Sequence, residues 1–384
     1  MKKILLFLLV LGTLTTFIYK DNTAFADSEK SLSNAKATYL MDYYSQTEIF
    51  AANENKRLPI ASMTKIMLLN LVFENLENGK INLTDKVLVS KTASAMGGSQ
   101  VFLQADKEYL LEDLVKSVIV ASANDASVAL AELLFGSEQA ATDKMNEKAK
   151  EWGLENTLFS NCTGLPKATQ YSSAKDVAVM LKKLLAYEGY YKYSTIWLDE
   201  LTHPDGKKTT LTNTNKLTKF YNGCDGGKTG YTNDAGYCLA CTAKRGISRI
   251  ICVVIGEEDS KVRFNDVSNM FNYAFNNYTQ KIVVDKDETP FDAISVVGGK
   301  YESVDVVPAT SVFAFLQKNE NPSFTMDVKM NKNIKAPFDI NTKVGELTVF
   351  KDGVEYKKVD LVTANLGEKQ SFADAVEKFS KKWA

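Results

Sequence analysis

Histidine is almost absent from this chain of 384 residues, in which His203 is the only example. A metal site made of several histidines is therefore excluded, and a triad of serine, histidine and aspartate would depend on that one residue. An excess of charge is also absent, because 46 lysines and arginines oppose 47 aspartates and glutamates. With no basic field to attract phosphate groups, nucleic acid is not an expected partner. We expect neither a metal nor another cofactor.

Cysteine is scarce, and its number is odd, so the cysteines cannot all pair into disulfides. Two of them form a C-x-x-C sequence in a segment typical of a strand, where positions three apart face opposite sides. We therefore expect buried thiols rather than a shared metal or a redox disulfide. The five are Cys162, Cys224, Cys238, Cys241 and Cys252, of which Cys238 and Cys241 form the C-x-x-C pair.

The N-terminus resembles an export signal. Lys2 and Lys3 precede an apolar stretch, residues 4–18, which is short for a membrane span of about 20 residues. Ala24-Phe25-Ala26 then gives the small residues at which a signal peptidase cleaves. We predict a signal peptide over residues 1–26 and a mature protein outside the cytoplasm. The alternative is an uncleaved N-terminal anchor.

Periodicity in the first two thirds of the chain predicts a sheet with an inserted block of helices. Strand-like segments at 37–43 and 47–52 form a hairpin, and further strands fall within 226–256. Between them, apolar residues at helical spacing predict several helices. These are a helix that opens near Ser62 and ends at Gly79, a pair over 112–135 broken near 121–125, and helices near 140–152 and 174–186. Another helix is predicted over 263–275.

The composition changes near Lys281. Residues 282–365 show short alternating segments with proline and glycine between them, which predicts a small all-β domain. Helical spacing returns over 371–383, where one face gathers apolar side chains and lysines lie nearby. The apolar residues are Phe372, Val376, Phe379 and Trp383, and the lysines are Lys378, Lys381 and Lys382. We expect this helix to bind a membrane surface. The alternatives are packing on the β domain or a frayed tail.

Three short motifs carry groups able to do chemistry: Ser62-x-x-Lys65, Ser122-x-Asn124 and Lys228-Thr229-Gly230. The pattern S-x-x-K also begins at Ser33 and Ser172, so it is weak alone. Ser62 differs because it stands just after a proline, at the start of a strong helix. There, a lysine three residues later shares its face, and backbone N–H groups favour developing negative charge.

A lysine base suits a chain with so little histidine. A serine hydroxyl needs a neighbour to accept its proton. Lys65 would serve if burial or a second cation such as Lys228 lowered its pKa from about 10.4.

The order of these motifs resembles that of penicillin-binding proteins and class A β-lactamases. More specifically, the chain is similar to the low-molecular-mass, type-5-like D-alanyl-D-alanine carboxypeptidases. The resemblance covers residues from about 35 to 280 and continues into that family's β domain. It is carried by residues 59–65, 121–126, 161–165, 171–174 and 225–232, with Ala235-Gly-Tyr237, Ala336-Pro337 and 343–347.

This resemblance implies an α/β domain of the serine β-lactamase and penicillin-binding transpeptidase type, an antiparallel sheet with a helical block, followed by a small all-β domain. It implies as partners the peptidoglycan pentapeptide stem and, as covalent inhibitors, β-lactam antibiotics. The location would be the outer face of the cytoplasmic membrane or the cell wall. The expected division is a signal peptide over 1–26, a catalytic domain over 27–281, a β domain over 282–366 and a membrane-associated helix over 367–384.

The resemblance also implies a role for each motif residue. Ser62 attacks the carbonyl between the two D-alanines, and Lys65 accepts its proton. Ser122 and Asn124 relay protons and hold the substrate amide.

The remaining implied roles concern substrate binding. Lys228 and Thr229 recognise the terminal carboxylate, and Arg263 is a further candidate for that contact. Gly230 lets the substrate approach the strand. The backbone N–H groups of Ser62 and Tyr231 form the oxyanion hole. Many family members have histidine where this chain has Tyr231, and the family's middle region often has one where Thr169 and Gln170 stand.

Two other functions stay open from the sequence alone. A class A β-lactamase needs a glutamate that positions water for deacylation. The segment Glu155-Asn-Thr-Leu-Phe159 does not match the expected E-x-x-L-N closely, and the β domain also argues against a lactamase. A catalytically idle wall-binding scaffold is the second alternative, and release of D-alanine would discriminate it from an enzyme.

Overall fold

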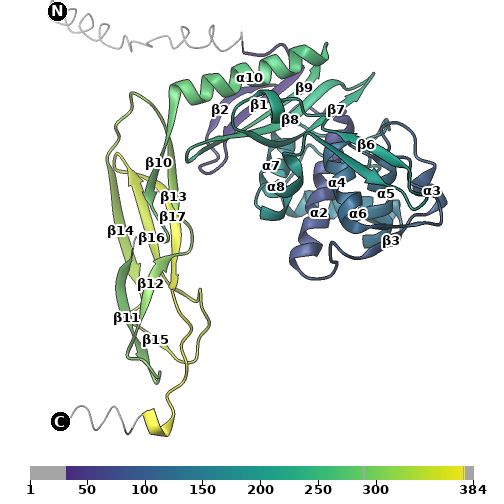
Figure 1. Cartoon of the computed structure of the whole chain (residues 1–384). Helices are drawn as coiled ribbons and strands as arrows, with labels where there is room; N and C mark the ends of the chain where they lie inside the picture. Colours follow the sequence, from purple (N-terminus) through teal and green to yellow (C-terminus); the bar gives the residue numbers. More distant parts are fainter. Residues whose placement is uncertain (1–31, 289, 375, 377–384) are drawn as a thin grey trace, which may run out of the picture.

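A five-stranded antiparallel sheet is the centre of the first domain in the computed structural model, which describes residues 32–288, 290–374 and 376. Its strands are β1 (Ala37–Asp42), β2 (Glu48–Ala52), β7 (Cys224–Thr232), β8 (Gly236–Arg245) and β9 (Ser248–Glu257). They lie in the order β2-β1-β9-β8-β7 (Figure 1). The sheet is therefore built from both ends of the domain, as the sequence predicted. The predicted signal peptide lies outside the described residues.

The two faces of this sheet bury different cores. Along β8, Cys238 and Ala240 belong to the core shared with most of the helices, whereas Leu239 and Cys241 belong to the core under α10 (Ser260–Asn277). This alternation follows the two-residue period of a strand. The two cysteines of the C-x-x-C sequence thus face opposite sides, as expected, and all five cysteines are buried free thiols.

A block of helices lies between β2 and β7 in the sequence. Its centre is α2, in which every residue of Lys65–Phe73 is buried. The break in the predicted helix pair falls at 121–123, and the second helix of the pair ends at Gly136, whose φ of 80° suits a glycine cap. The helices are η1 (Ala61–Thr64), α2 (Lys65–Glu77), α3 (Lys91–Ser94), α4 (Leu111–Val120), α5 (Asn124–Phe135), α6 (Glu138–Glu151), α7 (Ala174–Leu184), α8 (Glu188–Ser194) and α9 (Leu217–Phe220).

Several short elements of this block have no counterpart in the sequence-based prediction. They are α3, α8 and α9 together with two small hairpins. The hairpins pair β3 (Lys86–Leu88) with β4 (Glu108–Leu110) and β5 (Leu198–Thr202) with β6 (Lys208–Thr212). Elements of three to seven residues carry too few positions for a period to be recognised.

The second domain is all-β, as predicted. One sheet has the strand order β14-β16-β17-β12-β11-β15, and β10 pairs separately with β13. Their core consists of apolar side chains such as Val306, Leu347 and Leu361. The strands are β10 (Tyr278–Val284), β11 (Phe291–Val297), β12 (Ser303–Pro308), β13 (Val312–Gln317), β14 (Phe324–Met330), β15 (Asn333–Lys335), β16 (Lys343–Lys351) and β17 (Val354–Thr363).

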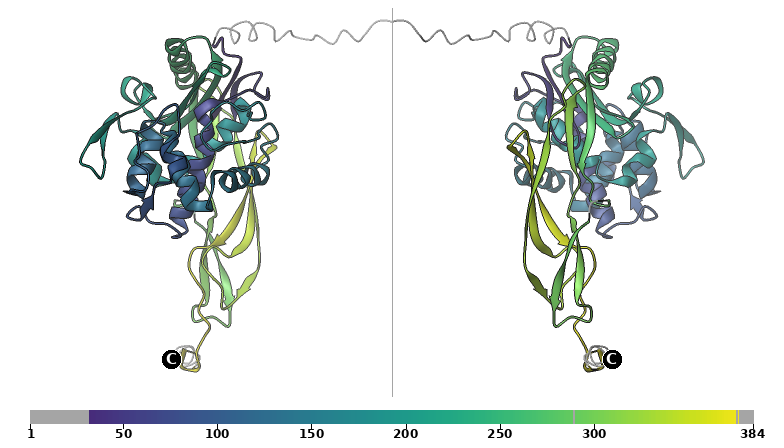
Figure 2. Two further views of the ribbon diagram at one scale, coloured as in Figure 1. Left: turned by 90° about the vertical axis from the view of Figure 1, so that its right-hand side faces the viewer. Right: turned by 90° about the vertical axis from the view of Figure 1, so that its left-hand side faces the viewer.

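The two domains meet near the end of α10, and the β domain extends away from that point (Figures 1 and 2). Strand β10 follows α10 directly, and Phe315 of β13 joins the core under that helix. The rings of Tyr44 and Phe313 stack across the junction at 4.4 Å between centroids. The last continuous described residues, up to 374, lie at the far end of the β domain from the first domain (Figure 1).

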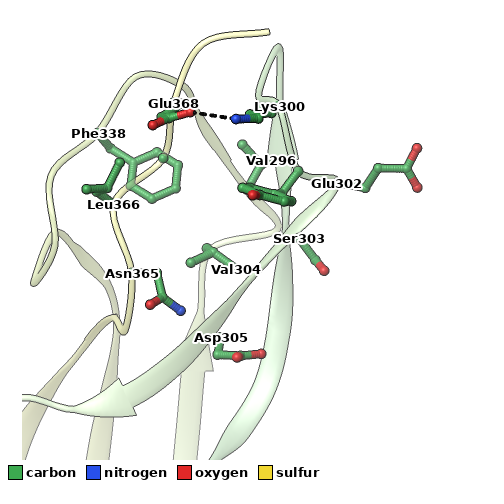
Figure 3. Close-up of a pocket in the computed structure, with 12 residues that line it drawn as sticks. Val296, Lys300, Glu302, Ser303, Val304, Asp305, Phe338, Asn365, Leu366 and Glu368 are labelled. Atoms are coloured by element: carbon green, nitrogen blue, oxygen red, sulfur yellow. Dashed lines mark hydrogen bonds and ion pairs between the residues drawn. The ribbon is translucent and has the colours of Figure 1, made fainter. Parts of the chain in front are cut away.

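A cavity of about 670 Å³ opens at this far end (Figure 3). Val304, Phe338 and Leu366 give it an apolar wall, and Lys300 pairs with Glu368 at 3.2 Å. It contains none of the motif residues. Among the described residues, no helix combines the length and the apolar character needed to cross a membrane.

Candidate active site

Ser62 lies in the short helix η1, directly before α2. The residue before it, Ala61, has a φ of 47°, which is a strained conformation for a residue other than glycine. Two glycines pack against this turn: a Cβ at Gly164 would lie 2.0 Å from the carbonyl oxygen of Ala61, and one at Gly230 would lie 2.6 Å from that of Ile60. Their lack of a side chain allows neighbouring segments to enclose the turn, while Ser62 itself stays half-buried.

Lys65 is fully buried beside this serine. Its Nζ donates hydrogen bonds to Ser62 Oγ at 3.0 Å, to Asn124 Oδ1 at 2.7 Å and to the carbonyl oxygen of Thr163. Burial lowers the pKa of Lys65 from 10.5 to about 7. A neutral amine is therefore available near neutral pH. The sequence offered burial or the nearby cation Lys228 as the cause, and burial is the dominant one.

Ser122 lies in the break between α4 and α5, and Asn124 is the first residue of α5. Ser122 has a φ of 63°, again a strained value, and its Oγ accepts a hydrogen bond from Lys228 Nζ at 2.7 Å. Asn124 Nδ2 donates to the carbonyl oxygen of Gly97 at 2.7 Å, which fixes the amide so that its oxygen faces Lys65. Each of the two buried lysines therefore donates a hydrogen bond to one of these side chains: Lys65 to Asn124 and Lys228 to Ser122.

Strand β7 carries Lys228, Thr229, Gly230 and Tyr231 along one side of the turn. Lys228 is buried, and burial lowers its pKa well below 10.5, with repulsion from Lys65 and Arg263 acting in the same direction. The hydroxyl of Thr229 donates to that of Thr214 at 2.7 Å. Helix α8 supports the start of the strand: Ser194 Oγ donates to the carbonyl oxygen of Asp225, and the hydroxyl of Tyr190 accepts from the Gly227 N–H.

Arg263 is buried where β7 and β8 meet. Its Nη1 donates to the backbone carbonyl oxygens of Gly230 at 3.1 Å and Cys238 at 3.2 Å. The guanidinium therefore joins the two strands directly beside the Lys-Thr-Gly motif. Tyr231 is half exposed, at 51%, and its ring stacks on that of Tyr237 at 4.4 Å.

Two contributors to this geometry were not singled out from the sequence. The carbonyl oxygen of Thr163 is an acceptor for Lys65. The buried carboxylate of Asp125 accepts hydrogen bonds from the N–H groups of Val101 and Leu103, which ties the loop before β4 to the start of α5. The backbone acceptor has no residue-type signature, whereas Asp125 stands directly beside the Ser122-x-Asn124 motif.

His203 lies outside this group. Its two ring nitrogens lie 2.8 Å from the hydroxyl of Tyr109 and 2.8 Å from that of Thr209. Both nitrogens are thus engaged, one with Tyr109 of β4 and the other with Thr209 of β6. In the part of the chain that the structure describes, no group of three or more histidine, cysteine, aspartate or glutamate side chains is arranged to hold a metal ion.

The site thus has a serine on the first turn of a helix, a lysine one turn later and a second lysine on the adjoining strand. This arrangement, on a sheet with inserted helices, defines the penicillin-binding class of serine enzymes. Residues 23–259 match the model of the D-alanyl-D-alanine carboxypeptidase family, Peptidase S11, and residues 278–369 match that of the penicillin-binding protein 5 C-terminal domain. The chain belongs to this family and is a serine-type D-alanyl-D-alanine carboxypeptidase.

Relatives match along most of the chain. The protein is 40% identical over 359 residues to D-alanyl-D-alanine carboxypeptidase DacF of Bacillus subtilis (strain 168), across 92% of this chain and 91% of that protein. It is 36% identical over 342 residues to DacC of Escherichia coli (strain K12), across 86% and 82%. The crystal structure of penicillin binding protein 5 from Haemophilus influenzae is similar with a TM-score of 0.70 at 29% identity, across 87% of this chain and 98% of that one. These matches favour neither the lactamase nor the idle scaffold.

Proposed function

We propose that the protein removes the terminal D-alanine from peptidoglycan pentapeptide stems through an acyl-enzyme on Ser62. The observation that carries the proposal is the 3.0 Å hydrogen bond between Lys65 Nζ and Ser62 Oγ. A serine becomes a nucleophile when a neighbouring base accepts its proton. Lys65 suits this task because burial lowers its pKa to about 7.

Acylation begins when Ser62 Oγ attacks the carbonyl between the two D-alanines and its proton passes to Lys65. The negative charge on the tetrahedral intermediate meets the backbone N–H groups of Ser62 and Tyr231. The C–N bond then breaks, and the proton that Lys65 accepted passes to the leaving amine through the hydroxyl of Ser122, which lies 2.7 Å from Lys228 Nζ. Lys65 is thereby neutral again. Water next attacks the ester while Lys65 accepts its proton, and the ester C–O bond breaks as that proton returns to Ser62 Oγ, which frees the shortened peptide.

Lys228 and Thr229 bind the terminal carboxylate of the substrate, and Arg263 supports the strand that carries them. In the free enzyme, burial, Lys65 and Arg263 all lower the pKa of Lys228. An arriving carboxylate supplies the missing counter-charge and raises that pKa again. Binding of the free acid therefore draws a proton onto Lys228. Arg263 acts mainly by holding Gly230 and the strand in place, since its Nη1 bonds to backbone carbonyls.

The cellular setting follows from the same family. Its homologues are penicillin-binding proteins of the periplasm or the cell surface. We propose cleavage after Ala26, a catalytic domain over 27–281, a β domain over 282–366 and attachment to the outer face of the membrane through 367–384. Phe372 and Val376, which begin that helix, are 86% and 53% exposed. Its other apolar and basic residues, from Lys378 to Trp383, lie outside the described residues.

Incubation of the mature protein with a pentapeptide ending in D-Ala-D-Ala tests this function. Free D-alanine should accumulate at one equivalent per peptide, and a Ser62→Ala variant should release none. Penicillin binding without any release of D-alanine would contradict the proposal and favour the idle scaffold.

A further inference from the structure

Strand β7 is irregular just before Lys228. Its pairing register with β8 shifts between Cys224 and Gly226. Gly227 then has a φ of 141°, a conformation that favours glycine, and a Cβ there would lie 2.4 Å from the carbonyl oxygen of Ala240. Two consecutive glycines leave the backbone more conformational freedom than other residues would. The position of Lys228 therefore depends on support from outside the strand.

The hydroxyl of Tyr190, on α8, gives this support. It accepts a hydrogen bond from the Gly227 N–H at 3.1 Å and donates one to the Gly227 carbonyl oxygen at 3.4 Å. Because β7 is the last strand of its sheet, these groups on its outer side bind Tyr190 instead of a neighbouring strand. One phenol group thus holds both backbone polar groups of the residue that precedes Lys228.

The ring of Tyr190 is fixed by its surroundings. It is 1% exposed and packs over Gly226, where a Cβ would lie 2.9 Å from the Cε1 atom of the ring. It also meets the ring of Phe73 edge-on, at 6.1 Å between centroids. Burial raises the pKa of Tyr190, so the hydroxyl keeps its proton and can both donate and accept. The support for Gly227 therefore comes from a rigid part of the helical block.

The side chain of Lys228 has reason to move when its backbone is free. It is buried, and both Lys65 and Arg263 repel its charge. Its Nζ nevertheless lies 2.7 Å from Ser122 Oγ, where the proposed mechanism places it. Rotation of the backbone at Gly227 would shift Nζ relative to that hydroxyl and to an arriving carboxylate, and small misplacements of this kind lower reaction rates.

We propose that Tyr190 is a positioning residue for the carboxypeptidase reaction. Its hydroxyl fixes the backbone at Gly227, so that Lys228 meets the terminal carboxylate of the substrate. Tyr190 itself touches neither the substrate nor the reacting atoms. The inference rests on the proposed function, because it takes from that function the role of Lys228 as the group that binds the carboxylate.

Tyr190→Phe tests the proposal, because it removes the hydroxyl and keeps the ring. The two substrates are a pentapeptide ending in D-Ala-D-Ala and the same peptide methylated at its terminal carboxylate. The quantity to measure is the acid preference, which is kcat/KM on the free acid divided by kcat/KM on the ester. We expect the acid preference of the variant to be roughly three- to tenfold below that of wild type, the effect of one net hydrogen bond.

Tyr191→Phe is the matched control. Tyr191 is the next residue of α8, and its hydroxyl donates to the carbonyl oxygen of Leu185, directly after α7, at 2.9 Å. This variant also loses one hydroxyl that is bonded to the backbone, but it should keep the acid preference of wild type. Thermal unfolding of both variants measures the loss of stability separately from the acid preference.

A double variant shows whether Tyr190 acts through Lys228. Adding Tyr190→Phe to Lys228→Ala should change the acid preference by less than about twofold, because residues that act as one unit are not additive. A further fall of three- to tenfold in the double variant would mean that Tyr190 acts by another route, and it would overturn the proposal.

The remaining outcomes separate the inference from the function on which it rests. A Tyr190→Phe variant that is less stable but keeps the acid preference would make Tyr190 a structural residue only, while the carboxypeptidase function stands. A fall of equal size in Tyr191→Phe would also overturn the proposal. If Lys228→Ala keeps the acid preference of wild type, the proposed role of Lys228 fails and the inference fails with it. No release of D-alanine by wild type would contradict the proposed function itself.

Discussion

The catalytic domain and the β domain treat buried polar groups in opposite ways. The first buries Lys65, Lys228, Arg249 and Arg263, whereas the described core of the second consists of valine, leucine and isoleucine side chains. A buried cation costs free energy unless it is paired or gives up its proton. Arg249 is paired with Asp225, but Lys65 and Lys228 instead have lowered pKa values. Burial of Lys65 thus lowers the stability of the catalytic domain and at the same time provides a neutral amine that can act as a base.

The backbone shows the same contrast. In the β domain, positive φ values outside glycine fall at Asn341 and Asp352, residue types that tolerate this conformation in turns. Beside the candidate nucleophile they fall at Ala61 and Ser122, which tolerate it less well. Strain of this kind persists where surrounding packing enforces it, and it gathers at functional sites. The comparison assigns the chemistry to the first domain.

Removing the proposed base should break the catalytic domain's function most severely. We expect Lys65→Ala to slow acylation by penicillin by on the order of 10³- to 10⁴-fold, because among the described residues no side chain other than Lys65 lies within hydrogen-bond distance of Ser62 Oγ. Stopped-flow or gel-based measurement of acylation, with circular dichroism to verify folding, checks this. Acylation at the wild-type rate at any neutral pH would refute the lysine-base mechanism.

Removing the second buried lysine should have a smaller and more selective effect. Lys228→Ala should lower kcat/KM by roughly 10- to 100-fold for peptides with a free terminal carboxylate, since a hydrogen bond to a charged group is lost. Peptides esterified at that carboxylate should lose much less. Equal losses on acid and ester would show that Lys228 does not read the carboxylate.

The stability cost of Lys65 should depend on pH. The unfolded chain holds a proton on this lysine up to pH 10.5, whereas the folded chain releases it near pH 7. Between these values the unfolded state binds more protons, so folding stability rises with pH, by at most about 1.4 kcal/mol per pH unit.

Chemical denaturation of wild type and Lys65→Met should therefore show a difference that moves in favour of wild type as the pH rises from 7 toward 10. Below pH 6 the difference should be flat, because the lysine is protonated in both states. A flat difference over the whole range would mean that the folded protein keeps Lys65 charged.

Deleting the tail should have the smallest effect on chemistry. Removal of residues 370–384 should leave activity on a soluble peptide unchanged, because residues 370–374, where the deleted segment begins, lie at the far end of the β domain from the first domain (Figure 1). It should abolish sedimentation with anionic liposomes, and high salt should weaken sedimentation of the full-length mature protein. If both forms sediment equally, or neither does, the helix is not the anchor.

Much of the fold could be predicted from the sequence because its long elements have clear periods. The buried strand at 250–255, the break near 121–125 and the opposite orientation of Cys238 and Cys241 all follow from strand and helix geometry. Helix α8 and the β5–β6 hairpin were not predicted, since seven or five residues are too few to show a period.

Site residues could be predicted from the sequence only where their side chains form a recognisable motif. Ser62, Lys65, Ser122 and Lys228 stand in recognisable motifs, but the Thr163 carbonyl that binds Lys65 is a backbone group found at every residue. Arg263 could be named from its position, whereas its actual bonds to the carbonyls of β7 and β8 depend on how the two strands meet. Tertiary contacts of this kind have no local pattern.

Mass spectrometry after exposure to penicillin tests the central claim, that Ser62 is the nucleophile, most directly. The mature protein should gain the mass of one penicilloyl group, on the peptide that contains Ser62, and the adduct should decay slowly. Ser62→Ala should gain none. An adduct on another residue, or no adduct at all, would contradict the account, and rapid turnover of penicillin would favour a β-lactamase instead.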